Sequence, residues 1–189
     1  MSYEMGIRRL DVTPPVGTFL AGYAARTEPS TGVYHPLTAT VVALNDGKTS
    51  LLIVSIEWLG FYDRAEAVRR VIHEATGVAA DHVLLLGTHT HCGPAMRAMD
   101  ARRHGDGTLS EDYLTDVIER LGDAAAEAMS DRTSVTLSTG SDWCGFAASR
   151  RKPDGDGGVL WEPSLDAPHD HEVPVVAYPL RRFEIRPWH

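Results

Sequence analysis

TSLLIVSIEWLGF, residues 49–61, is an apolar run of strand length that precedes DRAEAVRRVIHEATG, residues 63–77, and DHVLLLG, residues 81–87. The middle segment repeats apolar residues at helical spacing, and the last is again an apolar run of strand length. A strand–helix–strand unit pairs its two strands in parallel through a right-handed crossover. The run LLIVSI is apolar on both faces, which predicts a central strand covered on both sides.

The flanking segments extend this unit into an α/β fold. A second helix is predicted over residues 110–129, with Ser110 at its N-terminus. A hairpin is predicted at residues 45–47, where the sequence reads NDG. We therefore expect a mixed β-sheet sandwich with flanking helices 63–76 and 110–129. Further strands are expected in the segments GIRRLDV (6–12), LTATVVALND (37–46), TSVTLSTGSDW (133–143) and EVPVVAYPL (172–180).

Composition is that of a soluble globular protein. The chain has 189 residues, of which 43% are hydrophobic and 23% charged, with a net charge of −8. Its Lys and Arg residues are scattered along the sequence, so there is no basic patch that would indicate a nucleic-acid partner. The N-terminus shows no signal peptide, and no apolar run reaches the length of a transmembrane segment. With only two cysteines, which we interpret as reduced thiols, we expect a cytoplasmic protein.

Two histidines follow the second apolar strand, in GTHTHCGPA, residues 87–95. His89 and His91 are two residues apart, so in an extended chain they project to one side. Glu57 ends the neighbouring parallel strand, and the carboxyl ends of such strands meet at one edge of a sheet. Imidazole and carboxylate are the usual ligands of a catalytic zinc, which keeps an open position for water. The alternative is a histidine that merely bonds to backbone at a strand end.

Three other groups carry two interpretations each. The HDH sequence at residues 169–171 has the same spacing but lies in a polar loop, so we expect it to be solvated, with metal contact as the alternative. Arg150 and Arg151 are expected to be surface charge, or one of them could clamp an anionic or carbonyl group. Cys92 is expected to fill a turn, with a thiol nucleophile as the alternative.

Several segments, taken in order, resemble the N-terminal catalytic domain of the neutral/alkaline non-lysosomal ceramidase family. The Thr-His-Thr-His motif with Gly-Pro is the specific part of this resemblance. It covers residues 1–178, and residues 179–189 form an unmatched tail. The segments that carry it are RRLDVTPPVGTFLAGYAAR (8–26), GVYHPLTATVVALNDG (32–47), LLIVSIEWLG (51–60), GTHTHCGPA (87–95), GFAASRRKP (145–153) and DHEVPVV (170–176).

The resemblance implies roles for individual residues. His89 would be a zinc ligand, and His91 an active-site histidine that contacts water or the substrate amide. Gly22 would lie at the pocket wall, Arg150 would be the active-site arginine, and Glu57 stands where the family has a strand-end aspartate. The family's enzymes hydrolyse ceramide to sphingosine and a fatty acid, so the resemblance implies a zinc-dependent amide hydrolase with a small-molecule or lipid amide as substrate.

The family's remaining zinc ligands have no counterpart in this sequence. They follow the Asp-x-Glu-Val segment in the family, whereas residues 179–189 here match none of them. We therefore expect an incomplete catalytic domain. The alternative function is a non-catalytic binding or assembly protein that retains the fold. A sheet domain cut part-way leaves strand edges unpaired and apolar faces uncovered, so we also expect homo-oligomerisation.

Overall fold

The structure is a computed structural model that describes residues 3–23, 25–97 and 109–178. The chain forms two compact units, Met1–Val135 and Thr136–His189, and each is described by itself. The predicted tail, residues 179–189, lies outside the described residues, so its boundary stays a prediction.

The first unit contains a five-stranded mixed sheet in the order β4-β3-β2-β1-β5. Strands β3 and β4 are parallel, as the strand–helix–strand pattern predicts, and the remaining pairs are antiparallel. The predicted hairpin at residues 45–47 joins β2 to β3. The strands are β1 (Tyr3–Asp11), β2 (Thr38–Asn45), β3 (Ser50–Ile56), β4 (Val83–Gly87) and β5 (Thr133–Val135).

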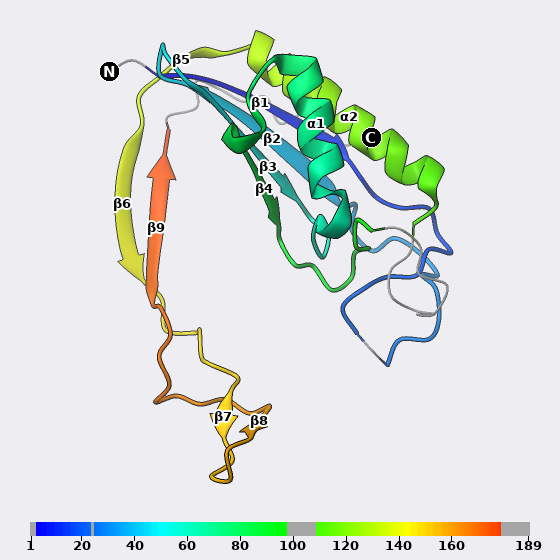
Figure 1. Cartoon of the computed structure of the whole chain (residues 1–189), viewed down its shortest axis with the longest axis vertical. Helices are drawn as coiled ribbons and strands as arrows, with labels where there is room; N and C mark the ends of the chain where they lie inside the picture. The colour runs from blue at the N-terminus through cyan, green and yellow to red at the C-terminus, as the bar shows by residue number, and fades with distance from the viewer. Residues whose placement is uncertain (1–2, 24, 98–108, 179–189) are drawn as a thin grey trace. The chain divides into compact units, whose positions relative to one another are not determined.

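Two α-helices pack against each other in this unit (Figure 1). Helix α2 begins after Ser110, whose hydroxyl accepts a hydrogen bond from the Tyr113 backbone N–H at 3.3 Å, as expected of an N-cap. Helix α1 ends at Gly77, which has a left-handed backbone with φ +72°. The helices are α1 (Ala65–Thr76) and α2 (Glu111–Ser130), with short 3₁₀ turns at Tyr62–Arg64 and Ala80–His82. The mixed α/β fold class is confirmed.

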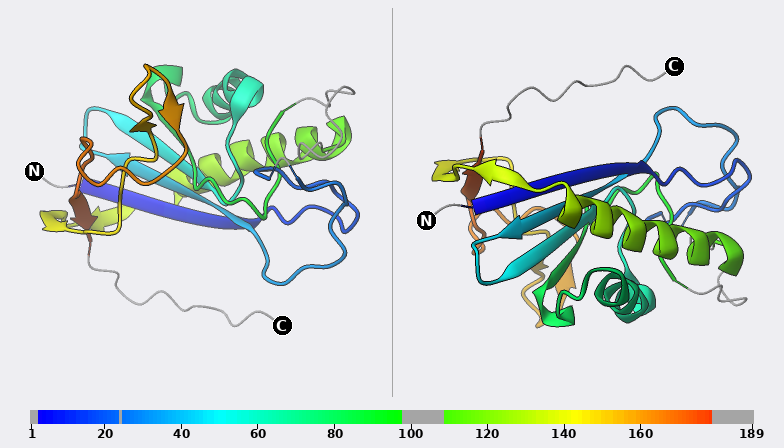
Figure 2. Two further views of the ribbon diagram at one scale, coloured as in Figure 1. Left: turned by 90° about the horizontal axis from the view of Figure 1, so that it is seen from below. Right: turned by 90° about the horizontal axis from the view of Figure 1, so that it is seen from above.

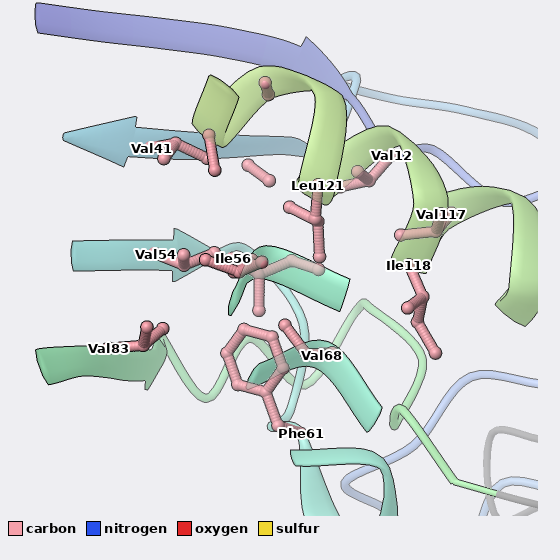
Figure 3. Packing of buried hydrophobic residues seen from close by; sticks show 14 of the residues in the cluster. Val12, Val41, Val54, Ile56, Phe61, Val68, Val83, Val117, Ile118 and Leu121 are labelled. Atoms are coloured by element: carbon pink, nitrogen blue, oxygen red, sulfur yellow. The ribbon is translucent and has the colours of Figure 1, made fainter. Parts of the chain in front are cut away.

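The core lies between the sheet and the two helices. Figure 3 shows side chains of the strands, such as Val54 and Ile56, facing Leu121 of α2 and Val68 of α1. Both helices lie on the same side of the sheet (Figure 2). Alternate residues therefore differ in exposure: Leu52 is fully buried, whereas the neighbouring Leu51 is 37% exposed. The prediction that β3 is covered on both sides is not met within the first unit, because its two helices pack on one face and Leu51 of the other face is partly exposed.

A buried tryptophan anchors the segment after β3. The indole Nε1–H of Trp58 donates to the Val12 carbonyl at 3.0 Å, and its ring stacks against Tyr113 with centroids 6.3 Å apart. The Tyr113 hydroxyl donates to the Thr13 carbonyl at 2.9 Å. Burial raises the pKa of Tyr113 to about 12, because the phenolate would be desolvated there. These contacts hold the carboxyl end of β3 and the segment after β1 in fixed positions.

The second unit is built from short antiparallel pairs. The predicted single strand over residues 133–143 is wrong, because the chain forms β5 and then β6. The two pieces pair with different partners, β5 with β1 and β6 with β9, so the ladder breaks between them. No described residue after 135 is buried. The strands are β6 (Ser138–Trp143), β7 (Lys152–Pro153), β8 (Val159–Leu160) and β9 (Glu172–Ala177).

Across residues 3–23, 25–97 and 109–178, no helix is long and apolar enough to span a membrane.

Candidate functional site

The candidate site begins where β3 and β4 end. The Thr88 N–H donates to the Ile56 carbonyl at 3.0 Å, so the two carboxyl ends lie side by side, as predicted. A Cβ on Gly87 would lie 2.8 Å from the Gly60 Cα. Only glycine allows this close approach of the two backbones. The turn that carries the two histidines is therefore packed directly against the segment that follows Glu57.

His89 is exposed, and only one of its two ring nitrogens has a hydrogen-bond partner among the described residues. Its Nδ1 lies 3.1 Å from the Leu59 carbonyl oxygen. A carbonyl oxygen only accepts, so Nδ1 carries the proton in the neutral imidazole, and Nε2 then keeps its lone pair. This outer hydrogen bond is the usual arrangement of a metal-ligating histidine. His89 also has a left-handed backbone, with φ +59°, a strained conformation that is concentrated at functional sites.

His91 lies beside His89 and is enclosed by the loop after β1. The two imidazole rings have centroids 4.9 Å apart at 71°, and Tyr23 makes a similar edge contact with His91 at 5.1 Å. Gly22 lies directly against His91, since a Cβ there would be 2.5 Å from the His91 Cγ. Gly22 also has φ +99°, which favours glycine. The structure therefore brings together His89, His91 and Gly22, three of the predicted site residues.

Arg26 holds this arrangement in place, and sequence reasoning missed it. Its guanidinium donates to the Ala21 carbonyl at 3.0 Å and to the His91 carbonyl at 3.1 Å. It also lies over the Tyr23 ring, 5.0 Å from the centroid. The Ala21 N–H donates to the Gly93 carbonyl at 2.9 Å, which adds a second link between the loop and the histidine turn. The only signal in the sequence is its place at the end of the segment GYAAR.

Glu57 is held toward β2 and not toward the imidazoles. Its Oε2 accepts hydrogen bonds from the Thr38 N–H at 2.7 Å and the Thr38 hydroxyl at 2.9 Å. Arg9 donates in turn to the Thr38 hydroxyl at 3.0 and 3.1 Å. Within the described residues, no three His, Cys, Asp or Glu side chains form a group that could hold a metal. The expected convergence of one carboxylate and two imidazoles on a metal is therefore not formed.

A cavity of about 530 Å³ opens beside Glu57. This volume lies within the usual range for small-molecule sites. Thr90 and Cys92 line the cavity, whereas His89 and His91 do not. Alternate residues of this segment therefore face the cavity and form the imidazole pair. Cys92 lies in a turn, as expected, but it is exposed and lines the cavity instead of packing inside the turn. The rest of the lining is largely apolar and includes Leu20, Val33, Pro36 and Leu37.

The other predicted residues lie in the second unit. Arg150 is exposed and follows Ser149, which forms an isolated β-bridge with Ser164. Its role beside the imidazoles stays a prediction. His169 and His171 are half-buried, with ring centroids 4.2 Å apart, so the expectation that they are simply solvated is wrong.

Comparison with known proteins identifies the fold. No protein-family model matches the sequence, and no curated protein is similar to it. Solved structures that are similar include a ceramidase complexed with C2 and the neutral ceramidase from Pseudomonas aeruginosa. Each has a TM-score of 0.68 and 18% sequence identity, over 94% of this chain and 29% of the ceramidase chain. The chain thus spans less than a third of those proteins, and it has a ceramidase-like fold.

Proposed function

We propose that this chain is part of a metal-dependent amide hydrolase of the ceramidase type, with Zn²⁺ as the metal. The observation that carries the proposal is His89, whose Nδ1 is hydrogen-bonded to the Leu59 carbonyl and whose ring lies beside that of His91. Imidazole nitrogen is a preferred zinc ligand. Such a metal polarises a carbonyl and supplies an activated water.

The imidazoles fit zinc, but they supply only part of a coordination shell. A catalytic zinc is held by three protein ligands, and the described residues bring together two imidazoles without a third metal-binding side chain. The proposal therefore requires a further ligand from outside the described residues. If no such ligand exists, the incomplete coordination shell favours the alternative, a non-catalytic binding or assembly protein.

The proposed roles of His89, His91, Gly22 and Glu57 follow their contacts, whereas that of Arg150 follows the resemblance to the ceramidase family. His89 acts as a metal ligand, and the adjacent ring of His91 exchanges a proton with the substrate amide or its attacking water. Gly22 leaves room for the His91 ring. Glu57 uses Oε2 to hold Thr38, and no described residue hydrogen-bonds its Oε1, which is free to accept from a substrate in the cavity. Arg150 is proposed to bind the carbonyl or an anionic group of the substrate.

The cavity supports an amide with an apolar chain as substrate. Its walls are largely apolar, with Glu57 as a charged group among them. Apolar pockets with a few polar groups bind ligands that are themselves mostly apolar. Ceramide, which would give sphingosine and a fatty acid, is the proposed substrate, and related N-acyl amides belong to the same class.

The test combines zinc content with amide hydrolysis. Asn tolerates a left-handed backbone, so His89→Asn removes the imidazole with little change in the turn. We expect this variant to lose one zinc ion per chain, measured by mass spectrometry of the metal. We expect His91→Gln to keep that zinc and to release fatty acid from a short-chain ceramide about 10²–10⁴-fold more slowly.

His73→Gln is the matched control. His73 also hydrogen-bonds a backbone carbonyl through Nδ1, but it lies on helix α1 and belongs to neither histidine pair. Equal zinc content in the wild type and His89→Asn would contradict the proposed metal site. Loss of zinc in His89→Asn without any hydrolysis by the wild type would favour the binding protein.

A further inference from the structure

A second pair of imidazoles lies in the second unit, just before β9. His169 and His171 have ring centroids 4.2 Å apart at 78°, closer than the pair at His89 and His91. Both residues are half-buried. The proposed hydrolase uses neither of them. Two imidazoles in edge contact on one short segment therefore need an account of their own.

Both rings are anchored through the same nitrogen. Nδ1 of His169 lies 2.6 Å from the Ala167 carbonyl oxygen, and Nδ1 of His171 lies 3.0 Å from the Cys144 carbonyl oxygen. Because a carbonyl oxygen only accepts, the neutral form of each ring carries its proton on Nδ1 and keeps a lone pair on Nε2. A hydrogen bond of this kind fixes the tautomer and orientation of a histidine that ligates a metal through its other nitrogen.

The backbone around the pair is also held in place. The Cys144 N–H donates to the His171 carbonyl at 2.9 Å, which continues the β6–β9 ladder beyond Trp143 and Glu172. Trp143 covers one side of His171, with ring centroids 4.9 Å apart. The rings therefore enter any complex with little conformational freedom left to lose, which favours binding.

We propose that His169 and His171 form a binding site for a divalent transition metal of the class that prefers imidazole, namely Zn²⁺, Ni²⁺ or Cu²⁺. Hard cations such as Mg²⁺ and Ca²⁺ prefer oxygen ligands and are excluded by this chemistry. No third His, Cys, Asp or Glu among the described residues joins the pair in a metal-binding group, so water completes the coordination. An open shell of this kind makes the metal exchangeable, in contrast to a closed structural zinc site.

The test uses the full chain with His89→Asn and His91→Gln already in place, so that the site of the proposed hydrolase cannot contribute. We expect this background protein to bind one Zn²⁺ per chain in a calorimetric titration. Adding His169→Gln and His171→Gln should weaken binding by more than the roughly 10–100-fold that loss of an outer-shell partner costs. Adding His73→Gln in their place should leave the affinity unchanged.

A second measurement does not depend on variants that fold. Zn²⁺ added to the wild-type protein should shift the imidazole Nε2 resonances of His169 and His171 in ¹⁵N NMR spectra, while Mg²⁺ should not. The proposal is overturned if the background protein binds no Zn²⁺, or if the shifts are confined to other histidines. Because this background lacks the first pair, failure of the hydrolase proposal leaves the outcome unaffected.

Discussion

His89 shows how one residue can concentrate the constraints on a site. Its left-handed backbone is a conformation that costs of order 1–3 kcal/mol for a residue other than glycine. The hydrogen bond to Leu59 and the packing of Gly87 against Gly60 determine the position of the turn. The surrounding contacts therefore offset the strain, and the hydrogen bond to Leu59 favours one orientation of the imidazole.

Gly22→Ala tests whether the loop after β1 positions His91. The new methyl group would overlap the His91 ring, and the backbone with φ +99° disfavours any side chain. Gly17→Ala is the matched control, because Gly17 has φ +95° and no atom within 4 Å of the added Cβ. We expect both to lose about 1 kcal/mol or more of unfolding free energy in urea.

Only Gly22→Ala should also move the His91 imidazole resonances in NMR spectra. Unchanged His91 resonances in Gly22→Ala would show that the loop does not position that ring.

At this scale the sequence predicts the identity of residues better than their partners. The histidine pair and its strand-end position are readable from spacing, and Gly22 from a resemblance to a family. Glu57 is at the expected strand end, yet its side chain bonds Thr38, a contact that depends on the β2–β3 pairing and on a rotamer. Arg26 has no periodicity or motif to identify it, because its partners are backbone carbonyls brought together only by the fold.

At the scale of elements, β3 separates a covered face from an uncovered one. Leu52 and Leu51 are neighbours in the chain, and only Leu52 faces the helices. The other face carries an apolar row across four strands, in which Ile7, Val42, Ile53 and Leu84 are paired in register. The helical layer therefore determines which leucine stabilises the unit.

Replacing each leucine by alanine should give unequal losses. Leu52→Ala removes a fully buried side chain, and we expect it to lower the free energy of unfolding by about 2–5 kcal/mol. Leu51→Ala should cost clearly less, because that side chain already contacts solvent. Denaturant unfolding of the two variants checks this. Similar losses would mean that another layer covers the second face.

Elements with strong periodicity are the ones that the sequence predicts well. Both helices and the parallel β3–β4 pair agree with the 3.6-residue and apolar-run patterns. Residues 133–143 alternate without interruption, so pattern alone predicts one strand. The break arises because the two strands have different partners. β5 pairs with β1, more than a hundred residues earlier, and β6 pairs with β9, about thirty residues later. A local sequence pattern contains no information on such distant partners.

At the scale of the whole molecule, the buried side chains are confined to one unit. Among the residues that the structure describes, every buried hydrophobic one lies between Met5 and Ala128, and none after 135 is buried. Burial of apolar surface is the main favourable term in folding. We therefore expect the first unit to supply most of the free energy of unfolding. The second unit consists of hydrogen-bonded strand pairs.

A shortened chain that ends at residue 135 should unfold cooperatively by itself. We expect its free energy of unfolding to lie within about 1 kcal/mol of that of the full chain, a small part of the 5–15 kcal/mol typical of a domain. Circular dichroism during urea unfolding of both proteins measures the difference. A shortened chain that is unfolded or aggregated in buffer would show that residues 136–189 stabilise the first unit.

The pairing of β1 with β5 sets a minimum time for folding during synthesis. Tyr3 pairs with Val135, so one edge of the sheet is completed only by residues that are made roughly 130 positions later. At about 5–20 residues per second, the ribosome needs between about 7 and about 26 seconds to make that stretch. Until then the first strand has β2 as its sheet neighbour and its other edge lacks β5, so the nascent chain exposes an edge that chaperones can bind.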